Sequence, residues 1–244
     1  MFLNLVKIEI LKLRNSNIEW LLLISVVLSL IIGFLPIFGT NPTDFSNIVQ
    51  MIMAYSSLFL PLITGVLATL LCYFEHQNGG WRKLASLPIK KYQIYLSKYL
   101  ILLGLIFIFQ FCFLLSMLAV SIINGVIRDV PIQAYIYTCV IGWVSCISLA
   151  AFQLALSMYF KSFATPTIIN VFLTFPALLI ANTEILSVIY PWSHPMISML
   201  QTFIQTIGGD SGFLENGILL VFSLLISSCL FLLSGSYYSK IKEY

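Results

Sequence analysis

The stretch FEHQNGGWRKLASLPIKKYQIYLSKY, residues 74–99, is the most polar part of an otherwise apolar chain. Five of the twelve lysines and arginines lie in it: Arg82, Lys83, Lys90, Lys91 and Lys98. Long uncharged runs flank it on both sides, at residues 48–74 and 99–124. Apolar runs of about 20 residues or more are long enough to cross a bilayer as helices. The stretch therefore predicts a polar loop between two membrane-spanning helices.

The composition of the whole chain indicates an all-α integral membrane protein. The 244 residues have a mean hydropathy of +1.01, and only 9% of them are charged. Soluble domains carry roughly 25% charged residues, and open sheet edges cannot exist in lipid. The net charge of +3 comes without a basic patch interleaved with aromatic residues, so we expect no nucleic-acid partner.

Uncharged runs between polar breaks predict six transmembrane helices within a single domain, residues 1–244. The expected spans are residues 20–38, 48–74, 99–124, 133–160, 166–182 and 217–238. Residues 1–17 place apolar side chains on one helical arc, which favours a helix lying on the membrane surface. Residues 187–216 are too polar and broken to span, and predict extracellular re-entrant helices that satisfy their backbone against neighbouring helices.

The distribution of positive charge predicts the orientation. With the N-terminus inside, eleven of the twelve lysines and arginines face the cytoplasm, and only Arg128 lies outside. Both termini and the loop at residues 75–98 are then cytoplasmic. Tyr190 and Trp192 are expected at the outer membrane boundary, where such aromatic side chains are common.

Motifs for catalysis are missing from the sequence. It has no GxxxxGK[ST] motif for nucleotide phosphates and no HExxH motif for zinc. His76 and His194 are expected on opposite sides of the membrane, which excludes a metal site that uses both. No acidic residue lies deep in a predicted span, which argues against a pump driven by protons or sodium. An intramembrane protease or acyltransferase would need Glu/His or Ser/His groups at one depth, and none converge.

The polar loop holds the one local pattern that suggests an interaction. Two glycines break the helix that leaves the second span, and Pro88 ends a short helix over residues 81–87. On this helix Trp81 and Leu84 share a face, with Arg82 beside them. Such a helix is suited to docking onto another protein. A positively charged anchor with a Trp at the membrane interface explains the same residues equally well.

The expected topology and this loop resemble permeases of the ABC-2 type. The nearest branch is that of lantibiotic-immunity and bacteriocin permeases, or exporters of amphipathic, phenol-soluble modulin-like peptides. An E…GxW…L-P-[IL] pattern of the family is matched by Glu75, Gly80, Trp81, Leu84, Leu87, Pro88 and Ile89, with Lys98 following. The resemblance implies that the loop forms a coupling helix held by a separate ATPase subunit. The implied ATPase-coupling residues are Glu75, Gly79, Gly80, Trp81, Arg82, Leu84, Leu87 and Pro88.

The resemblance also implies a transport subunit that is not itself an enzyme. ATP and Mg²⁺ would be bound by two cytoplasmic ABC ATPase subunits, and this chain would bind no cofactor or metal. A second copy or a related permease would complete the transporter in the lipid of a bacterial plasma membrane. In the family, spans two and five often face the partner subunit. Candidates for lining the pathway are therefore Phe59, Thr64, Phe172 and Phe175, although packing between spans explains each of them as well.

The expected cargo is an amphipathic antimicrobial or cytolytic peptide, moved for secretion or for self-immunity. One alternative is an ABC-2 exporter of a lipid or another hydrophobic compound. An alternative from another class is a membrane immunity or binding protein that works without ATP. Co-purification of an ATPase separates that protein from a transporter.

Overall fold

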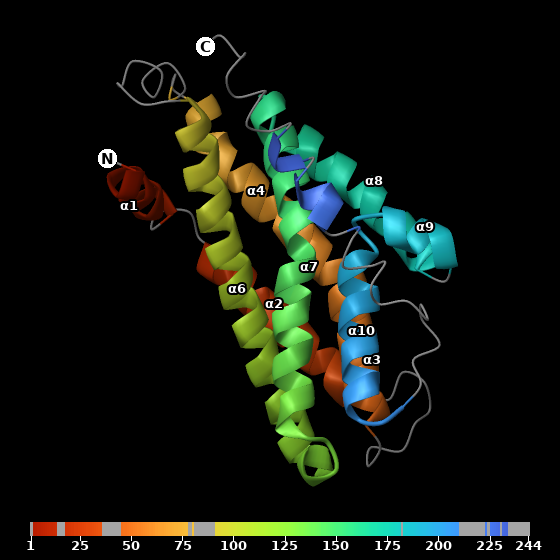
Figure 1. The fold of residues 1–244 in the computed structure, drawn as a ribbon. Coiled ribbons are helices and arrows are strands. Elements are labelled where there is room, and N and C mark those ends of the chain that lie inside the picture. The colour runs from red at the N-terminus through yellow and green to blue at the C-terminus, as the bar shows by residue number, and fades with distance from the viewer. Residues whose placement is uncertain are drawn as a thin grey trace.

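The computed structural model describes residues 2–13, 18–35, 45–77, 80, 91–181, 183–209, 223, 225–229 and 231–233. Every regular element within these ranges is a helix, which confirms the all-α prediction (Figure 1). Three continuous helical runs are long and apolar enough to cross a membrane: Ser46–His76, Tyr92–Ile123 and Ile132–Tyr159. A fourth is present if the bent pair Val6–Leu13 and Ile18–Phe34 forms one span. The count of six spans stays a prediction.

The first two helices meet at a sharp bend. Helix α1 (Phe2–Leu13) and helix α2 (Ile18–Phe34) differ in direction by 69°. Along α1, Ile8, Ile10 and Leu11 are exposed, whereas Glu9 is buried against the bundle. An acidic residue therefore occupies the inner face of α1, and apolar residues lie on its outer face.

The next helical run contains a widened turn near its middle. Helix α3 (Ser46–Ala54) continues through the π-helix η1 (Tyr55–Phe59) into α4 (Leu60–His76). The amide of Leu60 donates to the carbonyl of Tyr55, five residues back. Pro61 follows directly and has no N–H to donate, so a regular α-helical ladder cannot form here. The widened turn lies between α3 and α4 within one continuous helical run.

A long hairpin forms the centre of the bundle. Helix α6 (Lys91–Ile123) turns at Gly125, whose φ of 75° is in the left-handed region that glycine adopts readily. The short 3-10 helix η2 (Val126–Arg128) then leads into α7 (Ile132–Tyr159). At 1.5 Å per residue these helices are about 50 and 42 Å long, more than the roughly 30 Å hydrocarbon core requires.

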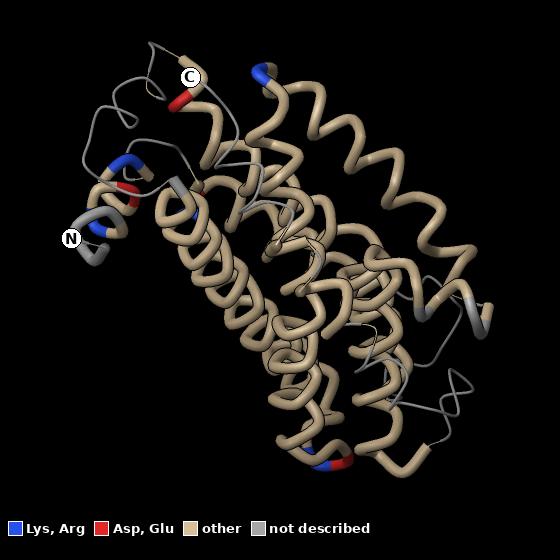
Figure 2. The backbone as a smooth tube through the Cα atoms, turned by 45° about the horizontal axis from the view of Figure 1, so that its top comes forward, with Lys and Arg blue, Asp and Glu red and all other residues tan. Residues whose placement is uncertain are grey.

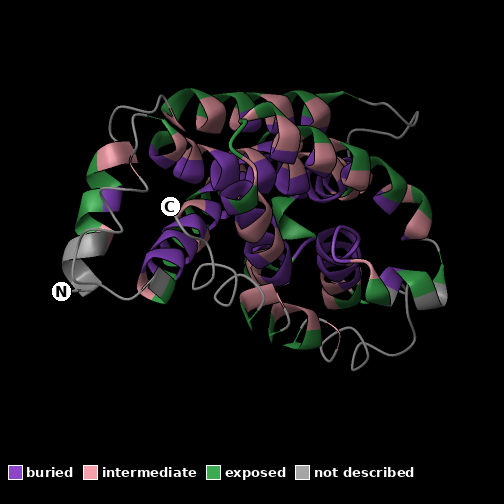
Figure 3. Ribbon diagram, turned by 90° about the horizontal axis from the view of Figure 1, so that it is seen from above, coloured by how far each residue is buried: buried purple, intermediate pink, exposed green. Residues whose placement is uncertain are grey.

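Three shorter helices follow α7. Helix α8 (Ala164–Ile180) contains Pro176, and α9 (Glu184–Ile189) and α10 (His194–Thr206) follow it. Residues 191–200 are all buried. Seen along the bundle, buried residues fill the centre while α1 lies to one side (Figure 3).

The bundle has two chemically distinct ends. At one end α4 ends at His76 and α6 begins at Lys91, and we call it the loop end. At the other, α6 and α7 meet through η2, and we call it the hairpin end. Figure 2 shows blue and red residues near these two ends, and residues 46–74, 99–123 and 132–159 contain no charged side chain. This pattern fits helices that cross a bilayer.

Candidate functional site

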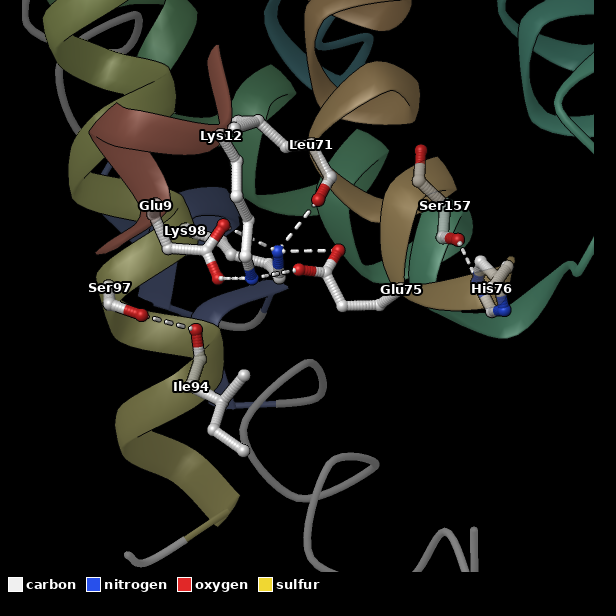
Figure 4. Close-up of polar contacts among 9 residues, drawn as sticks. All are labelled: Glu9, Lys12, Leu71, Glu75, His76, Ile94, Ser97, Lys98 and Ser157. Carbon is white, nitrogen blue, oxygen red and sulfur yellow. Dashed lines mark hydrogen bonds and ion pairs between the residues drawn. The ribbon is translucent and has the colours of Figure 1, made fainter. Parts of the chain in front are cut away.

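The polar loop begins and ends in a buried group of four charged side chains. Glu75 lies one residue before the last residue of α4, and Lys98 lies in the third turn of α6. Glu9 and Lys12 reach them from α1, so three helices meet at the loop end (Figure 4). The exposed fraction is 0% for the Lys98 side chain, 2% for Glu75 and 4% for Glu9. We call these four residues the ion-pair network.

Lys98 is the most deeply buried member of the ion-pair network. Its Nζ lies 2.9 Å from Glu9 Oε2 and 2.9 Å from Glu75 Oε2. The same nitrogen donates to the backbone carbonyl of Leu71 at 2.7 Å. The contacts with Glu9 Oε2 and the Leu71 carbonyl are hydrogen bonds, whereas Glu75 Oε2 is held by the ion pair and accepts no hydrogen bond among the described residues. Lys98 thus contacts two carboxylates and one carbonyl while it is fully buried.

Lys12 closes the ion-pair network from the other side. Its Nζ lies 3.1 Å from Glu9 Oε1 and 2.7 Å from Glu75 Oε1. Each carboxylate therefore has one oxygen on Lys12 and the other on Lys98. The two positive and two negative charges balance, and Lys12 alone is partly exposed, at 33%.

The closed arrangement makes the ion-pair network sensitive to the loss of any one member. Removing one partner of a buried ion pair typically costs about 3–5 kcal/mol, because an uncompensated charge stays in a low-dielectric site. Glu75 lies at the end of α4, directly before the segment that joins α4 to α6, and Lys98 lies near the start of α6, after that segment. The network therefore holds both ends of the loop, and α1 with them, as one unit.

Further hydrogen bonds join this unit to α7. Tyr95 and Tyr99 lie on the buried face of α6, and their hydroxyls donate to the carbonyls of Ala151 at 3.1 Å and Ile147 at 3.0 Å. His76 Nε2 lies 3.1 Å from the carbonyl of Ser157, close to where α7 ends. Helices α1, α4, α6 and α7 are thus joined by polar contacts at the base of the polar loop.

Gly80 shows how the loop begins. Its N–H donates to the carbonyl of Gln77 at 3.2 Å, so the chain turns directly after α4. A Cβ atom built on Gly80 would lie 2.8 Å from the Cα of Glu75, which is closer than side chains tolerate. Glycine at this position lets the backbone fold back onto the residue that joins the ion-pair network.

The remaining predicted coupling residues lie outside the described residues: Gly79, Trp81, Arg82, Leu84, Leu87 and Pro88. Of that set the structure places Glu75 and Gly80, and it brings them together. The coupling role of all eight stays a prediction.

The four candidate pathway residues lie in different environments. Thr64 is fully buried in α4, and its hydroxyl donates to the carbonyl of Leu60 at 2.8 Å. Phe59 is partly buried against the core. Phe172 and Phe175 are 73% and 59% exposed, and lie about one turn apart on α8. The two phenylalanines of α8 thus form a common surface, whereas Thr64 packs inside the bundle.

Sequence reasoning missed the two partners that α1 supplies. In the sequence, Lys12 was used only as one of the positive charges that predict the orientation, and Glu9 was given no role. Their spacing of three residues places them on one helix face, and this spacing could have indicated that they interact. That spacing is also common between pairs exposed to solvent, so it does not reveal burial.

A comparison with known protein families identifies the family of this chain. The model of the ABC-2 family transporter protein matches residues 5–177. This chain belongs to the ABC-2 transporter family. The match includes all four residues of the ion-pair network. No curated protein and no solved structure matches the chain.

Membership of the ABC-2 family settles the class of protein. The chain is a membrane permease of a transporter and not a catalytic subunit. The family also implies partnership with ABC ATPase subunits. The ABC-2 resemblance drawn from the polar loop is thereby confirmed, whereas the peptide-exporting branch stays a prediction.

Proposed function

We propose that this ABC-2 permease exports amphipathic peptides from a bacterial plasma membrane or cytoplasm with energy from separate ATPase subunits. The observation that carries the proposal is the ion-pair network, which joins α1, α4 and α6 at the base of the loop. A loop that served only as a positively charged anchor would not require buried ion pairs between the helices at its two ends.

The proposed mechanism uses this base as a rigid connection. Two cytoplasmic ATPase chains, with ATP and Mg²⁺, hold the loop through Trp81, Arg82 and their neighbours. When ATP binding closes the ATPase pair, the loop moves with it. Glu75 and Lys98 form ion pairs with each other and with residues of α1. Helices α1, α4 and α6 therefore move together, and the membrane-spanning helices change their tilt.

A second permease, identical or related, completes the proposed transporter. The exposed Phe172 and Phe175 on α8 give one chain an aromatic surface that a second chain can cover. Aromatic side chains are enriched where proteins contact one another. The transport pathway would then lie between the two permeases, bordered by these residues.

The proposed cargo follows from the lack of charge along the helices. Residues 46–74, 99–123 and 132–159 contain no charged side chain. Such helices offer apolar and weakly polar contacts, which suit the apolar face of an amphipathic peptide taken from the bilayer. Self-immunity and secretion of cytolytic peptides both require this cargo. A lipid or another hydrophobic compound is the alternative cargo.

Affinity purification tests the proposal. The tagged permease is expressed in its native host, and the proteins that co-purify are identified by mass spectrometry. We expect an ABC ATPase to co-purify, and the W81A/R82A double variant to lose it while remaining in the membrane. K161M, which changes an exposed lysine near the loop end, is the matched control and should retain the ATPase.

Other results would contradict specific parts of the proposal. If no ATPase co-purifies with the wild-type permease, the alternative of an ATP-independent immunity or binding protein is favoured. If W81A/R82A retains both the ATPase and transport, the loop is not the coupling element.

A further inference from the structure

The turn between α9 and α10 is buried inside the bundle rather than at its end. Helix α10 runs antiparallel to α7, since Trp192 contacts Phe152 at 5.3 Å and Phe203 contacts Tyr135 at 6.0 Å between ring centroids. Phe152 lies seven residues before the end of α7, or about 10 Å along the helix. The turn therefore lies in the half of the bundle nearer the loop end.

Asn170 of α8 joins this turn to α4. The indole N–H of Trp192 donates to Asn170 Oδ1 at 2.9 Å. The amide Nδ2 of Asn170 donates to the carbonyl of Pro61 at 2.9 Å. Asn170 is 1% exposed, so both hydrogen bonds are shielded from water. One side chain thus contacts two elements that are 131 residues apart in the sequence.

A glycine makes the contact with α4 possible. A Cβ atom on Gly65 would lie 2.1 Å from Asn170 Nδ2, well inside van der Waals distance. Gly65 lies one turn after Pro61 on the same face of α4. Glycine there allows the amide of Asn170 to reach the backbone of α4.

Helix α4 connects this contact to the ion-pair network. Pro61 and Glu75 both belong to α4 and are about 21 Å apart along its axis. The π-helix η1 lies directly before α4. Such widened turns often mark functional sites within helices. A movement of α4 relative to α3 would occur at this turn.

We propose that Asn170 is a positioning residue, which transmits the movement of α4 to the buried turn between α9 and α10. The inference rests on the proposed function, in which ATP binding moves α4 through the loop. Movement of α4 shifts the carbonyl of Pro61, and Asn170 and Trp192 follow it. The loop end is thereby coupled to helix α10, which reaches toward the hairpin end.

Two measurements test the proposal. In the purified permease without ATPase, Trp192 is kept as the single tryptophan and its quenching by acrylamide is measured. In the complex with its ATPase in liposomes, transport and ATP hydrolysis are measured separately. The variants are N170L and W192F, which remove the acceptor and the donor of the hydrogen bond between Trp192 and Asn170. W192F is used only in the complex, because the quenching measurement needs Trp192.

The control variant is T174V. Thr174 is buried one turn after Asn170 on α8, and its hydroxyl donates to the carbonyl of Asn170 within the helix. T174V removes a buried polar group without breaking a contact between helices. It should leave quenching, hydrolysis and transport unchanged.

We expect N170L to increase the quenching of Trp192. In the complex, N170L and W192F should each lower transport about tenfold, which corresponds to ~1.4 kcal/mol, because both variants remove the hydrogen bond between Trp192 and Asn170. ATP hydrolysis should continue, and the N170L/W192F double variant should be no worse than either single variant, because both break one connection.

Each contrary result identifies what fails. If Trp192 is quenched equally in N170L and the wild type, Asn170 does not have the proposed role. The same holds if N170L transports as well as T174V. Both results leave the proposed function intact. A double variant with about a hundredfold loss also overturns the role of Asn170, because independent effects multiply. Absence of ATP-driven transport in the wild type overturns the proposed function, and the coupling role falls with it.

Discussion

Replacing Lys98 by Met removes the fully buried positive charge of the ion-pair network. Three contacts of Nζ are lost, at 2.9, 2.9 and 2.7 Å. Glu9 and Glu75 then share Lys12 alone, and one negative charge stays uncompensated. Leaving such a charge buried costs about 3–5 kcal/mol. For a chain of this size we expect the melting temperature to fall by roughly 6–20 °C.

Adding E9Q to K98M tests whether charge balance is the cause. The double variant keeps the Lys12–Glu75 pair, at 2.7 Å, and restores neutrality. We therefore expect K98M/E9Q to be more stable than K98M. The melting temperature is measured in detergent by size-exclusion chromatography after heating. K161M, at an exposed site, should stay within about 0.5 kcal/mol of the wild type.

Two results would refute this reasoning. A melting temperature of K98M close to that of K161M would mean that the ion-pair network does not form. A K98M/E9Q variant less stable than K98M would mean that charge balance does not govern the site.

The other predictions concern packing inside the bundle, and thermal denaturation in detergent checks each. The hydroxyl of Tyr55 is buried without a hydrogen-bond partner among the described residues, so Y55F should leave stability unchanged or raise it. Y95F removes a hydrogen bond to α7 at 3.1 Å and should cost about 1 kcal/mol; equal effects of Y55F and Y95F would contradict both assignments. A Cβ on Gly142 would lie 2.4 Å from Gln110 Nε2 and 2.5 Å from Met199 Sδ, so G142A should cost about 1–3 kcal/mol. M199A removes the overlap with Met199 but not that with Gln110, so the loss in the G142A/M199A double variant should be smaller than the sum of the single losses, and additive losses would argue against the packing described.

Local sequence patterns were sufficient to predict the helical class and part of the site. Apolar runs longer than a bilayer requires can only form helices in lipid, and the described chain is helical. Glu75 was found because it belongs to a pattern around the loop. Lys98 followed the same pattern, although its complete burial was not predictable from its position.

Contacts between distant segments account for what the sequence did not predict. Glu9 reaches Lys98 because α1 bends by 69° from α2 and lies against the loop end. No periodicity within residues 1–17 specifies that bend. Trp192 was expected at a membrane boundary, where tryptophan is common. In the structure it is buried against Phe152 and donates to Asn170, and neither partner is adjacent to it in the sequence.

Peptide uptake by inside-out proteoliposomes tests the central claim most directly. The liposomes contain the permease with its co-purifying ATPase, and a labelled amphipathic peptide is added outside with ATP and Mg²⁺. The account predicts ATP-dependent accumulation of peptide in the lumen, lost in W81A/R82A and retained in K161M. Accumulation that is equal with and without ATP, or equal in W81A/R82A and the wild type, would contradict it.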